Sequence, residues 1–218
     1  MKVVAFVPLK LNNERLPGKN TKILHDGRAL MECVLETLEQ AALIDEVYVY
    51  CSSDEVLKYI SSDEVRFLRR DARLDGASIK INEVLSSFAR DVYADIYVLV
   101  HATAPFISVS SIERGVEAVL EGGYDSALSV LRLQEFFWRE GRPLNYDLEN
   151  IPRTQDLEPF FVETTGLYIY GRSLIVDAGR RIGSAPFLVE VNKIEALDVN
   201  DPIDFEIVDA VLSRGLVR

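Results

Sequence analysis

Positive charge is concentrated near the N-terminus, in the segment that follows the first apolar run of the chain. Residues 8–20 hold Lys10, Arg15 and Lys19 against a single acid, Glu14. Basic side chains gathered in one loop of an otherwise acidic chain favour local capture of a small polyanion over binding of a long one. The segment contains neither a Walker A motif nor GxGxxG, because the glycines that those motifs require are missing.

The remaining residues of this loop suit a turn that could cradle phosphate. Asn12 and Asn13 tolerate left-handed backbone conformations that direct N–H groups inward, and Pro17-Gly18 can turn the chain back. On charge alone, a solvated basic loop would be the favoured interpretation. The position of the loop changes this balance, because a long loop directly after the first strand is where an α/β fold of this kind binds nucleotide.

The composition limits the classes of function. The 218 residues are 48% hydrophobic and 27% charged, as in an ordinary globular protein, and contain no apolar run near 18 residues. We therefore expect no transmembrane helix, no signal peptide, no membrane partner and a cytoplasmic location. The net charge of −11 disfavours a nucleic-acid partner. Cys33 and Cys51 lack the spacing of a zinc site and are expected to be buried free thiols.

Strand-like and helix-like segments alternate along the first 131 residues. The strand candidates are rich in β-branched residues and lie at 3–7, 46–51, 65–68, 96–100 and 126–131. Helical periods lie at 29–43, 80–88 and 110–120, with a short helix opening at Asp54. This alternation predicts a doubly wound, mostly parallel sheet of the α/β class. Ligands bind beyond the carboxyl ends of such strands, so the loops expected to line the site follow Val7, Cys51, Val100 and Val191.

The pattern changes after residue 131. Residues 132–158 are rich in charge, proline and aromatic side chains and show no helical period, so we expect an arm on a single domain that spans residues 1–218. A strand at 162–170, a short helix at 172–178 and a last strand at 187–191 follow the arm. The aromatic residues of the arm favour a protein interface over a ligand site, and they are Phe136, Phe137, Trp138 and Tyr146.

Two helix starts carry capping signals. Ser110 followed by Glu113 has the spacing of a capping box, so both residues are expected to be structural. Asp201 followed by Pro202 is typical of an N-cap and first-turn pair, and the helix that they open should run to about Leu212.

Seven further segments combine with the basic loop, which ends in LPGKN, into an ordered series across residues 7–204. These segments are 52–54 (SSD), 67–69 (FLR), 75–78 (DGAS), 101–106 (HATAPF), 153–157 (RTQDL), 165–169 (TGLYI) and 198–204 (DVNDPID). Each is weak alone, but their order is specific. Together they resemble the acylneuraminate cytidylyltransferases, which make CMP-sialic acid and related CMP-sugars and whose signature loop reads roughly P-A-R-x-G-S-K-G-L-P-x-K-N.

The resemblance implies a fold like that of the nucleotide-diphospho-sugar transferases. It also implies an enzyme that transfers CMP from CTP to an acidic, sialic-acid-like sugar and releases pyrophosphate. A homodimer is implied as well, in which the arm reaches the partner's site.

The resemblance also implies roles for individual residues. Lys10 and Lys19 would act catalytically by gripping the triphosphate, and Mg²⁺ would be held by Asp198 and Asn200. The residues implied in nucleotide binding are Pro8, Leu9, Lys10, Asn12, Asn13, Lys19, Arg69, Ser78, Ala102 and Thr103. Those implied in sugar binding are Ala104, Gln155 and Thr165.

The chain departs from the family pattern where charge matters. Lys10 stands where the family has arginine, which keeps the charge but loses the bidentate fork. Asn200 replaces the second carboxylate of D-x-D and could reach magnesium only as a neutral ligand. Asp201 could take its place at a metal, although the N-cap role is favoured.

These departures leave other functions open. The chain could be a nucleotidyltransferase for another sugar or another nucleotide, or a sugar-nucleotide-binding protein without catalysis. The sequence identifies no general base. His25 is expected at the surface, and for His101 a ligand contact and a plain hydrogen-bonding role are equally open.

Overall fold

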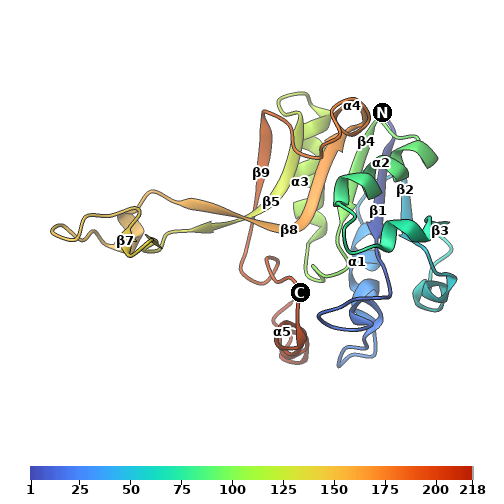
Figure 1. Cartoon of the computed structure of the whole chain (residues 1–218), viewed down its shortest axis with the longest axis horizontal. Coiled ribbons are helices and arrows are strands. Elements are labelled where there is room, and N and C mark those ends of the chain that lie inside the picture. Colours follow the sequence, from blue (N-terminus) through green and yellow to red (C-terminus); the bar gives the residue numbers. More distant parts are fainter. Residues whose placement is uncertain (218) are drawn as a thin grey trace.

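A seven-stranded sheet forms the body of the molecule in the computed structural model of Figure 1, which describes residues 1–217. The strands lie in the order β3-β2-β1-β4-β8-β5-β9. Their bounds are β1 Val3–Pro8, β2 Glu46–Cys51, β3 Val65–Arg69, β4 Ile96–Val100, β5 Ser126–Leu133, β8 Phe160–Gly171 and β9 Pro186–Val191. Six strands share one direction, and β8 alone runs antiparallel to its neighbours β4 and β5. The predicted doubly wound, mostly parallel sheet is confirmed.

Helices cover both faces of this sheet. The helix bounds are α1 Leu30–Glu39, α2 Ile81–Asp91, α3 Val109–Leu120, α4 Arg172–Val176 and α5 Pro202–Ser213. The face with α1 and α3 buries Val3, Ala5 and Val7 of β1, whereas the face with α2 and α4 buries Val4 and Phe6. Since successive side chains of a strand point to opposite faces, a strand covered on both faces must be apolar throughout, as β1 is.

A third apolar cluster attaches α5 to the edge of the body. Phe205 and Val208 of α5 are buried against Leu30 and Cys33 of α1 and against Phe106, in the loop after β4. The segment that precedes α5 is therefore fixed near the ends of β1 and β4. Short 3-10 turns complete the connections: η1 Lys19–Thr21, η2 Asp54–Tyr59, η3 Ala72–Asp75 and η4 Thr154–Asp156.

The arm is a long ribbon that projects from the body (Figure 1). The outer ends of β5 and β8 pair up to Leu133 and Phe160, so β8 begins two residues earlier than predicted. Beyond them, β6 (Trp138–Arg139) and β7 (Arg142–Pro143) form a small hairpin. The aromatic side chains predicted for the arm pack on one another, with 4.6 Å between the ring centroids of Phe136 and Tyr146.

The capping prediction for α3 is wrong. Its N-cap is Ser108, whose hydroxyl accepts from the Ser111 amide at 3.1 Å, while the Glu113 carboxylate accepts from the Ala42 amide at 3.0 Å. The helix starts earlier because Glu195 holds the Ser108 amide at 3.0 Å, a tertiary contact that the local pattern does not contain. Helix α1 is also shorter than predicted, since residues 41–44 form a turn.

Two other local predictions are confirmed. Asp201 caps α5, accepting from the amides of Ile203 at 2.8 Å and Asp204 at 3.1 Å. Cys33 and Cys51 are buried free thiols. Among residues 1–217, no helix has both the length and the apolar character needed to cross a membrane.

Candidate functional site

A polar hollow of about 340 Å³ lies between the loop after β1 and the segment before α5. Its lining combines most of that loop with one residue that follows η3 and one that precedes α5: Lys10, Asn13, Glu14, Arg15, Leu16, Lys19, Ala77 and Asn200. The hollow therefore opens at the carboxyl end of β1, where the sequence predicted a site. The loops after β2 and β4 support this lining instead of contributing to it directly.

Backbone acceptors and a glycine fix the shape of the basic loop. Lys19 Nζ donates to the Val199 carbonyl at 2.8 Å, and the buried Asn20 amide donates to the Lys10 carbonyl at 2.9 Å. Gly18 opens η1 at φ 67°, a left-handed conformation that disfavours side chains. The loop is thus held at both ends, and its basic groups lie along one wall of the hollow.

Lys10 reaches toward η3. Its Nζ donates to the Asp75 carbonyl at 3.2 Å. The Asp75 carboxylate accepts from the buried Arg70 guanidinium, and the Ser52 hydroxyl donates to it at 2.5 Å. Sequence reasoning missed Arg70 and selected its neighbour Arg69, whose side chain is exposed and paired with Asp54 at 2.7 Å. The sequence signal that could have indicated Arg70 is the pair of adjacent arginines, Arg69 and Arg70, at the end of β3.

A chain of side-chain hydrogen bonds crosses the mouth of the hollow. Arg15 donates to Asn200 Oδ1 at 2.7 Å, and Asn200 Nδ2 donates to Asp198 Oδ2 at 2.7 Å. The Thr165 hydroxyl reaches the same Asp198 oxygen at 3.4 Å. Asn200 therefore connects a cation of the loop to the carboxylate predicted to hold magnesium, and its oxygen faces Arg15.

These residues fit magnesium only in part. Among residues 1–217, no cluster of three or more histidine, cysteine or acidic side chains could enclose a metal. Mg²⁺ commonly takes one or two carboxylates and completes its shell with water and substrate phosphates, and Asp198 suits that arrangement. Asn200 would have to turn its amide to offer oxygen. Asp201 is occupied as the cap of α5.

The charge on the loop is only loosely compensated. Lys10, Arg15 and Lys19 donate to two carbonyls and one amide, and none forms a salt bridge to a carboxylate of residues 1–217. Burial lowers the pKa of Lys19, and Arg15 adds to this effect, while Asp198 and Asp204 oppose it. An anion in the hollow would relieve the mutual repulsion of these cations.

His101 lies at the end of β4, close to this site. Burial, followed by the charge of Arg181, lowers its pKa to about 4, so the imidazole is neutral at pH 7. Its Nε2 is buried and has no hydrogen-bond partner among the described residues. His25, in contrast, is exposed, as expected.

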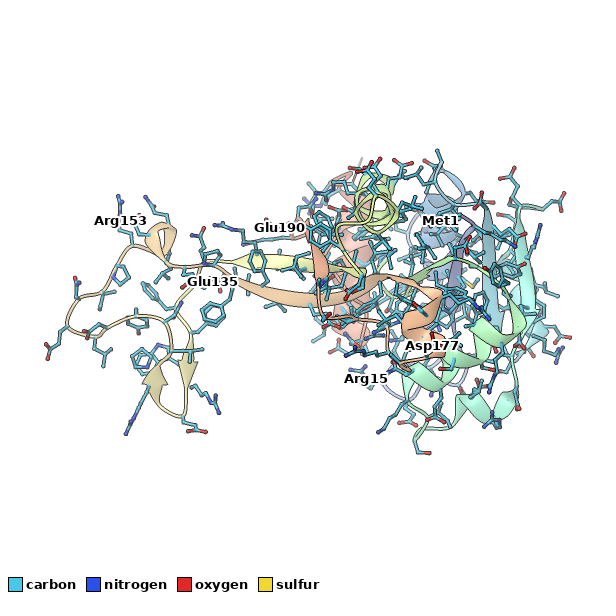
Figure 2. The ribbon with its side chains drawn as sticks, turned by 90° about the horizontal axis from the view of Figure 1, so that it is seen from above. Met1, Arg15, Glu135, Arg153, Asp177 and Glu190 are labelled. Carbon is cyan, nitrogen blue, oxygen red and sulfur yellow. The ribbon has the colours of Figure 1, made fainter. Side chains whose placement is uncertain are left out.

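The other predicted residues fall into three groups. The first has a structural position, because Leu9, Ala102 and Ala104 are buried in the core. Thr103 belongs to it as well, since its carbonyl accepts from the Val199 amide at 2.8 Å. The second does not line the hollow but is close in sequence to residues that do, and it comprises Pro8, Asn12 and Ser78. The third is Gln155, which stands on the arm beside Arg153, far from Arg15 in Figure 2.

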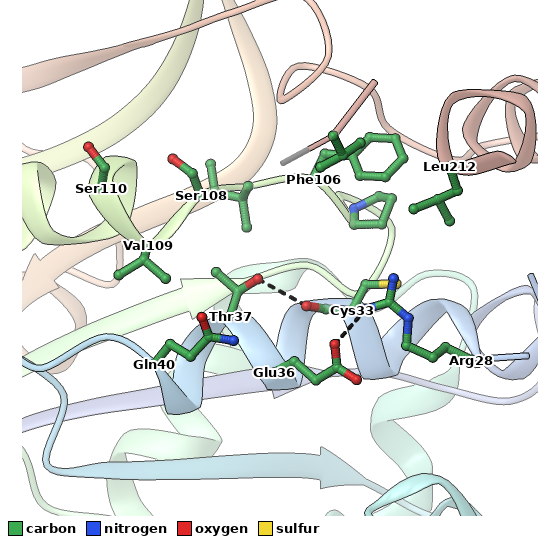
Figure 3. A pocket seen from close by; sticks show the side chains of 13 residues that line it. Arg28, Cys33, Glu36, Thr37, Gln40, Phe106, Ser108, Val109, Ser110 and Leu212 are labelled. Atoms are coloured by element: carbon green, nitrogen blue, oxygen red, sulfur yellow. Dashed lines mark hydrogen bonds and ion pairs between the residues drawn. The ribbon is translucent and has the colours of Figure 1, made fainter. Parts of the chain in front are cut away.

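A second hollow of about 510 Å³ lies between α1, the loop after β4 and α5. Its charged groups are paired with each other, because Arg28 donates to the Glu36 carboxylate at 2.5 Å, and the neutral Thr37 hydroxyl donates to the Cys33 carbonyl at 3.0 Å (Figure 3). Burial raises the pKa of Cys33 to about 11, so this thiol carries no charge at neutral pH. Although it is larger, this hollow offers no uncompensated charge to a polyanion, and we place the functional site at the basic loop.

The lowered pKa of His101 predicts a pH dependence of stability. The unfolded chain binds more protons than the folded one between the folded pKa of about 4 and the ordinary value of 6.5, so stability should fall as the pH drops through this window. At about 1.36 kcal/mol per pKa unit, the loss is up to about 3 kcal/mol. Urea unfolding of the wild type and of His101→Gln at pH 7, 5.5 and 4.5 checks it. Parallel profiles for the two proteins would show that His101 titrates normally.

Comparisons with known proteins show which proteins this chain is similar to. CMP:2-keto-3-deoxy-manno-octonic acid synthetase complexed with CTP has a similar fold, with a TM-score of 0.71 at 17% identity, covering 99% of this chain and 100% of that one. N-acylneuraminate cytidylyltransferase of Oncorhynchus mykiss is 26% identical over 221 residues, which are 97% of this chain and 50% of that protein. The chain thus spans about half the length of this relative.

A bacterial relative is matched over nearly its whole length. CMP-N,N'-diacetyllegionaminic acid synthase of Legionella pneumophila is 25% identical over 226 residues, which cover 97% of both chains. The family described as Cytidylyltransferase matches residues 4–202, a range that includes the basic loop, Asp198 and Asn200. The chain belongs to the cytidylyltransferase family.

Proposed function

We propose that this protein transfers CMP from CTP to an acidic, sialic-acid-like sugar and releases pyrophosphate. The observation that carries the proposal is the row of loosely compensated cations, Lys10, Arg15 and Lys19, in a hollow that also holds Asn200, the hydrogen-bond partner of Asp198. Such a hollow suits a triphosphate. The names of the relatives support CTP as the nucleotide and an acidic sugar as its acceptor.

The reaction asks the protein mainly for positioning and charge neutralisation. A hydroxyl of the sugar attacks the α-phosphorus of CTP, a new P–O bond forms, the bond to the bridging oxygen breaks, and pyrophosphate leaves. Lys10 and Lys19 would hold the triphosphate and neutralise the charge that grows on the leaving group. Magnesium bound at Asp198 would supply further neutralisation of the phosphate oxygens.

A binding protein without catalysis is the second candidate. One observation favours it. The Asn200 oxygen accepts from Arg15, so Asn200, which stands where the family has a second carboxylate, can bind a metal only after its side chain rearranges. A nucleotidyltransferase that uses another sugar or another nucleotide would carry out the same type of reaction, so it is a variant of the first candidate.

We also propose that the protein works in the cytoplasm as a homodimer joined through the arm. Apolar side chains are exposed along this segment, among them Trp138 at 55%, Ile151 at 61% and Phe161 at 41%. An isolated projection with this much exposed apolar surface is expected to be covered by a partner. In such a dimer, Gln155 of one subunit would approach the site of the other.

Pyrophosphate release tests the proposed activity. The protein is incubated with Mg²⁺, each of the four ribonucleoside triphosphates in turn, and N-acetylneuraminic acid, N,N'-diacetyllegionaminic acid or 2-keto-3-deoxy-manno-octonic acid. We expect release only with CTP and an acid, because the site pairs a cation-lined hollow with a family fold that handles cytidine nucleotides. CTP binding without release under any combination would instead establish the non-catalytic alternative.

Sedimentation tests the dimer. We expect a dimer at micromolar concentration, and Trp138→Asp should dissociate it because a carboxylate cannot be buried unpaired in an apolar interface. Leu57→Asp is the matched control, since Leu57 is exposed to a similar degree, 48%, but lies on the body. A wild type that sediments as a monomer, or a Trp138→Asp variant that stays dimeric, would refute an interface centred on the hairpin.

A further inference from the structure

A second group of polar side chains lies around Arg181, in the link between α4 and β9. The guanidinium stacks on Tyr168, with 3.6 Å between Cζ and the ring centroid, and the Arg181 side chain is only 17% exposed. Glu163 Oε1 lies 3.6 Å from Nη2, beyond hydrogen-bond reach, and accepts instead from the Tyr168 hydroxyl. Arg181 is therefore positioned by a ring and a nearby charge, while its N–H groups make no hydrogen bond to the described residues.

His101 supplies a second unsatisfied group near Tyr168. Its ring lies 6.2 Å from the Tyr168 ring, and its Nε2 is buried without a partner among residues 1–217. The backbone at His101 is held in place, because its amide donates to the Gly166 carbonyl at 3.0 Å. A buried polar atom without a partner in the chain is commonly satisfied by an ordered water or by a bound ligand.

The Arg181 group adjoins the hollow at the basic loop. The charges of Arg181, Lys19 and Asp198 all act on the pKa of His101, so these three side chains lie in its neighbourhood. Strand β8 joins them as well. Glu163 faces Arg181, and Thr165, two residues later, contacts Asp198 at 3.4 Å. The register of β8 with β5 shifts here and Thr165 has φ 61°, which re-aims side chains toward the site.

We propose that Arg181 binds the anionic group of the acceptor sugar and that His101 Nε2 makes a second polar contact with the same sugar. This inference rests on the proposed function, and it makes Arg181 the residue that selects acids over neutral sugars. A guanidinium offers two parallel N–H donors that match a carboxylate. Stacking on Tyr168 pre-organises this fork, and the loose contact with Glu163 leaves its donors available.

A purely structural role is the competing explanation. In that case Arg181 and Glu163 would only hold the link between α4 and β9 against β8, and removing Arg181 would lower stability without discriminating between substrates. The two explanations differ in the kinetic parameter that they affect. A sugar contact changes KM for the sugar and leaves KM for CTP alone.

The test is the pyrophosphate-release assay with the acid that gives the highest turnover, applied to Arg181→Ala, Arg181→Lys and Arg181→Gln. We expect Arg181→Ala and Arg181→Gln to raise KM for the acid at least tenfold, with KM for CTP within twofold of wild type and an unchanged melting temperature. Arg181→Lys should lie between, because it keeps the charge and loses the fork. Arg180→Ala is the matched control, an exposed neighbour whose backbone amide bonds the Leu174 carbonyl, and it should behave as wild type.

Other outcomes separate this inference from the proposed function. A wild type that turns over an acid, with sugar KM unchanged in all three Arg181 variants, overturns the inference and leaves the proposed function standing. Equal increases in both KM values with a lower melting temperature assign Arg181 a structural role and also overturn it. A wild type that releases no pyrophosphate with any acid overturns the proposed function and this inference with it. Should Arg181→Ala fail to fold, Arg181→Gln decides, because it keeps a long side chain over Tyr168.

Discussion

The hydrogen bond from Lys19 Nζ to the Val199 carbonyl, 2.8 Å long, joins two segments that are 180 residues apart. Val199 is fully buried, and its own amide is held by the Thr103 carbonyl at 2.8 Å. The loop after β1, the loop after β4 and the segment before α5 therefore meet at one residue. The hollow, the position of Asp198 and the proximity of His101 all depend on this meeting point.

Electrostatics explains why this junction is suited to an anion. The chain carries a net charge of −11, yet Glu14 is the single acid among the described residues that line the hollow, and the carboxylates around the start of α5 are engaged there. Asp201 and Asp204 cap α5, and Asp198 accepts from Asn200. The cations of the loop are consequently left with neutral acceptors. Burial of Lys19 with only partial compensation from the charges of Asp198 and Asp204 keeps the site receptive to phosphate.

The features that the sequence predicted well are those set by local patterns. The strands follow from β-branched runs buried on both faces, the cap of α5 from Asp201 and Pro202, and the basic loop from its charge and its place after the first strand. Family resemblance located Asp198 and Asn200 near Lys19, a proximity that no spacing within the chain reveals.

The features that it missed depend on tertiary contacts. Ser108 caps α3 because Glu195 arrives from a distant segment, and the buried Arg70 supports the carboxylate of Asp75, whose carbonyl receives Lys10. The amide of Asn200 bridges a cation and an acid only because Arg15 folds over it. Arg181 carries no local signal, and its environment appears only when β8 and the link before β9 come together.

The central claim is that the cations of the loop after β1 grip the triphosphate during the reaction, and the turnover of Lys10→Ala tests it most directly. Lys10 lines the hollow and contacts only a carbonyl within the described residues, so its removal should leave the fold intact. The account predicts a fall in kcat of about two orders of magnitude, in the range found when a charge-stabilising donor is removed, with Lys58→Ala, an exposed lysine of η2, equal to wild type. A change of less than about threefold in Lys10→Ala would contradict it.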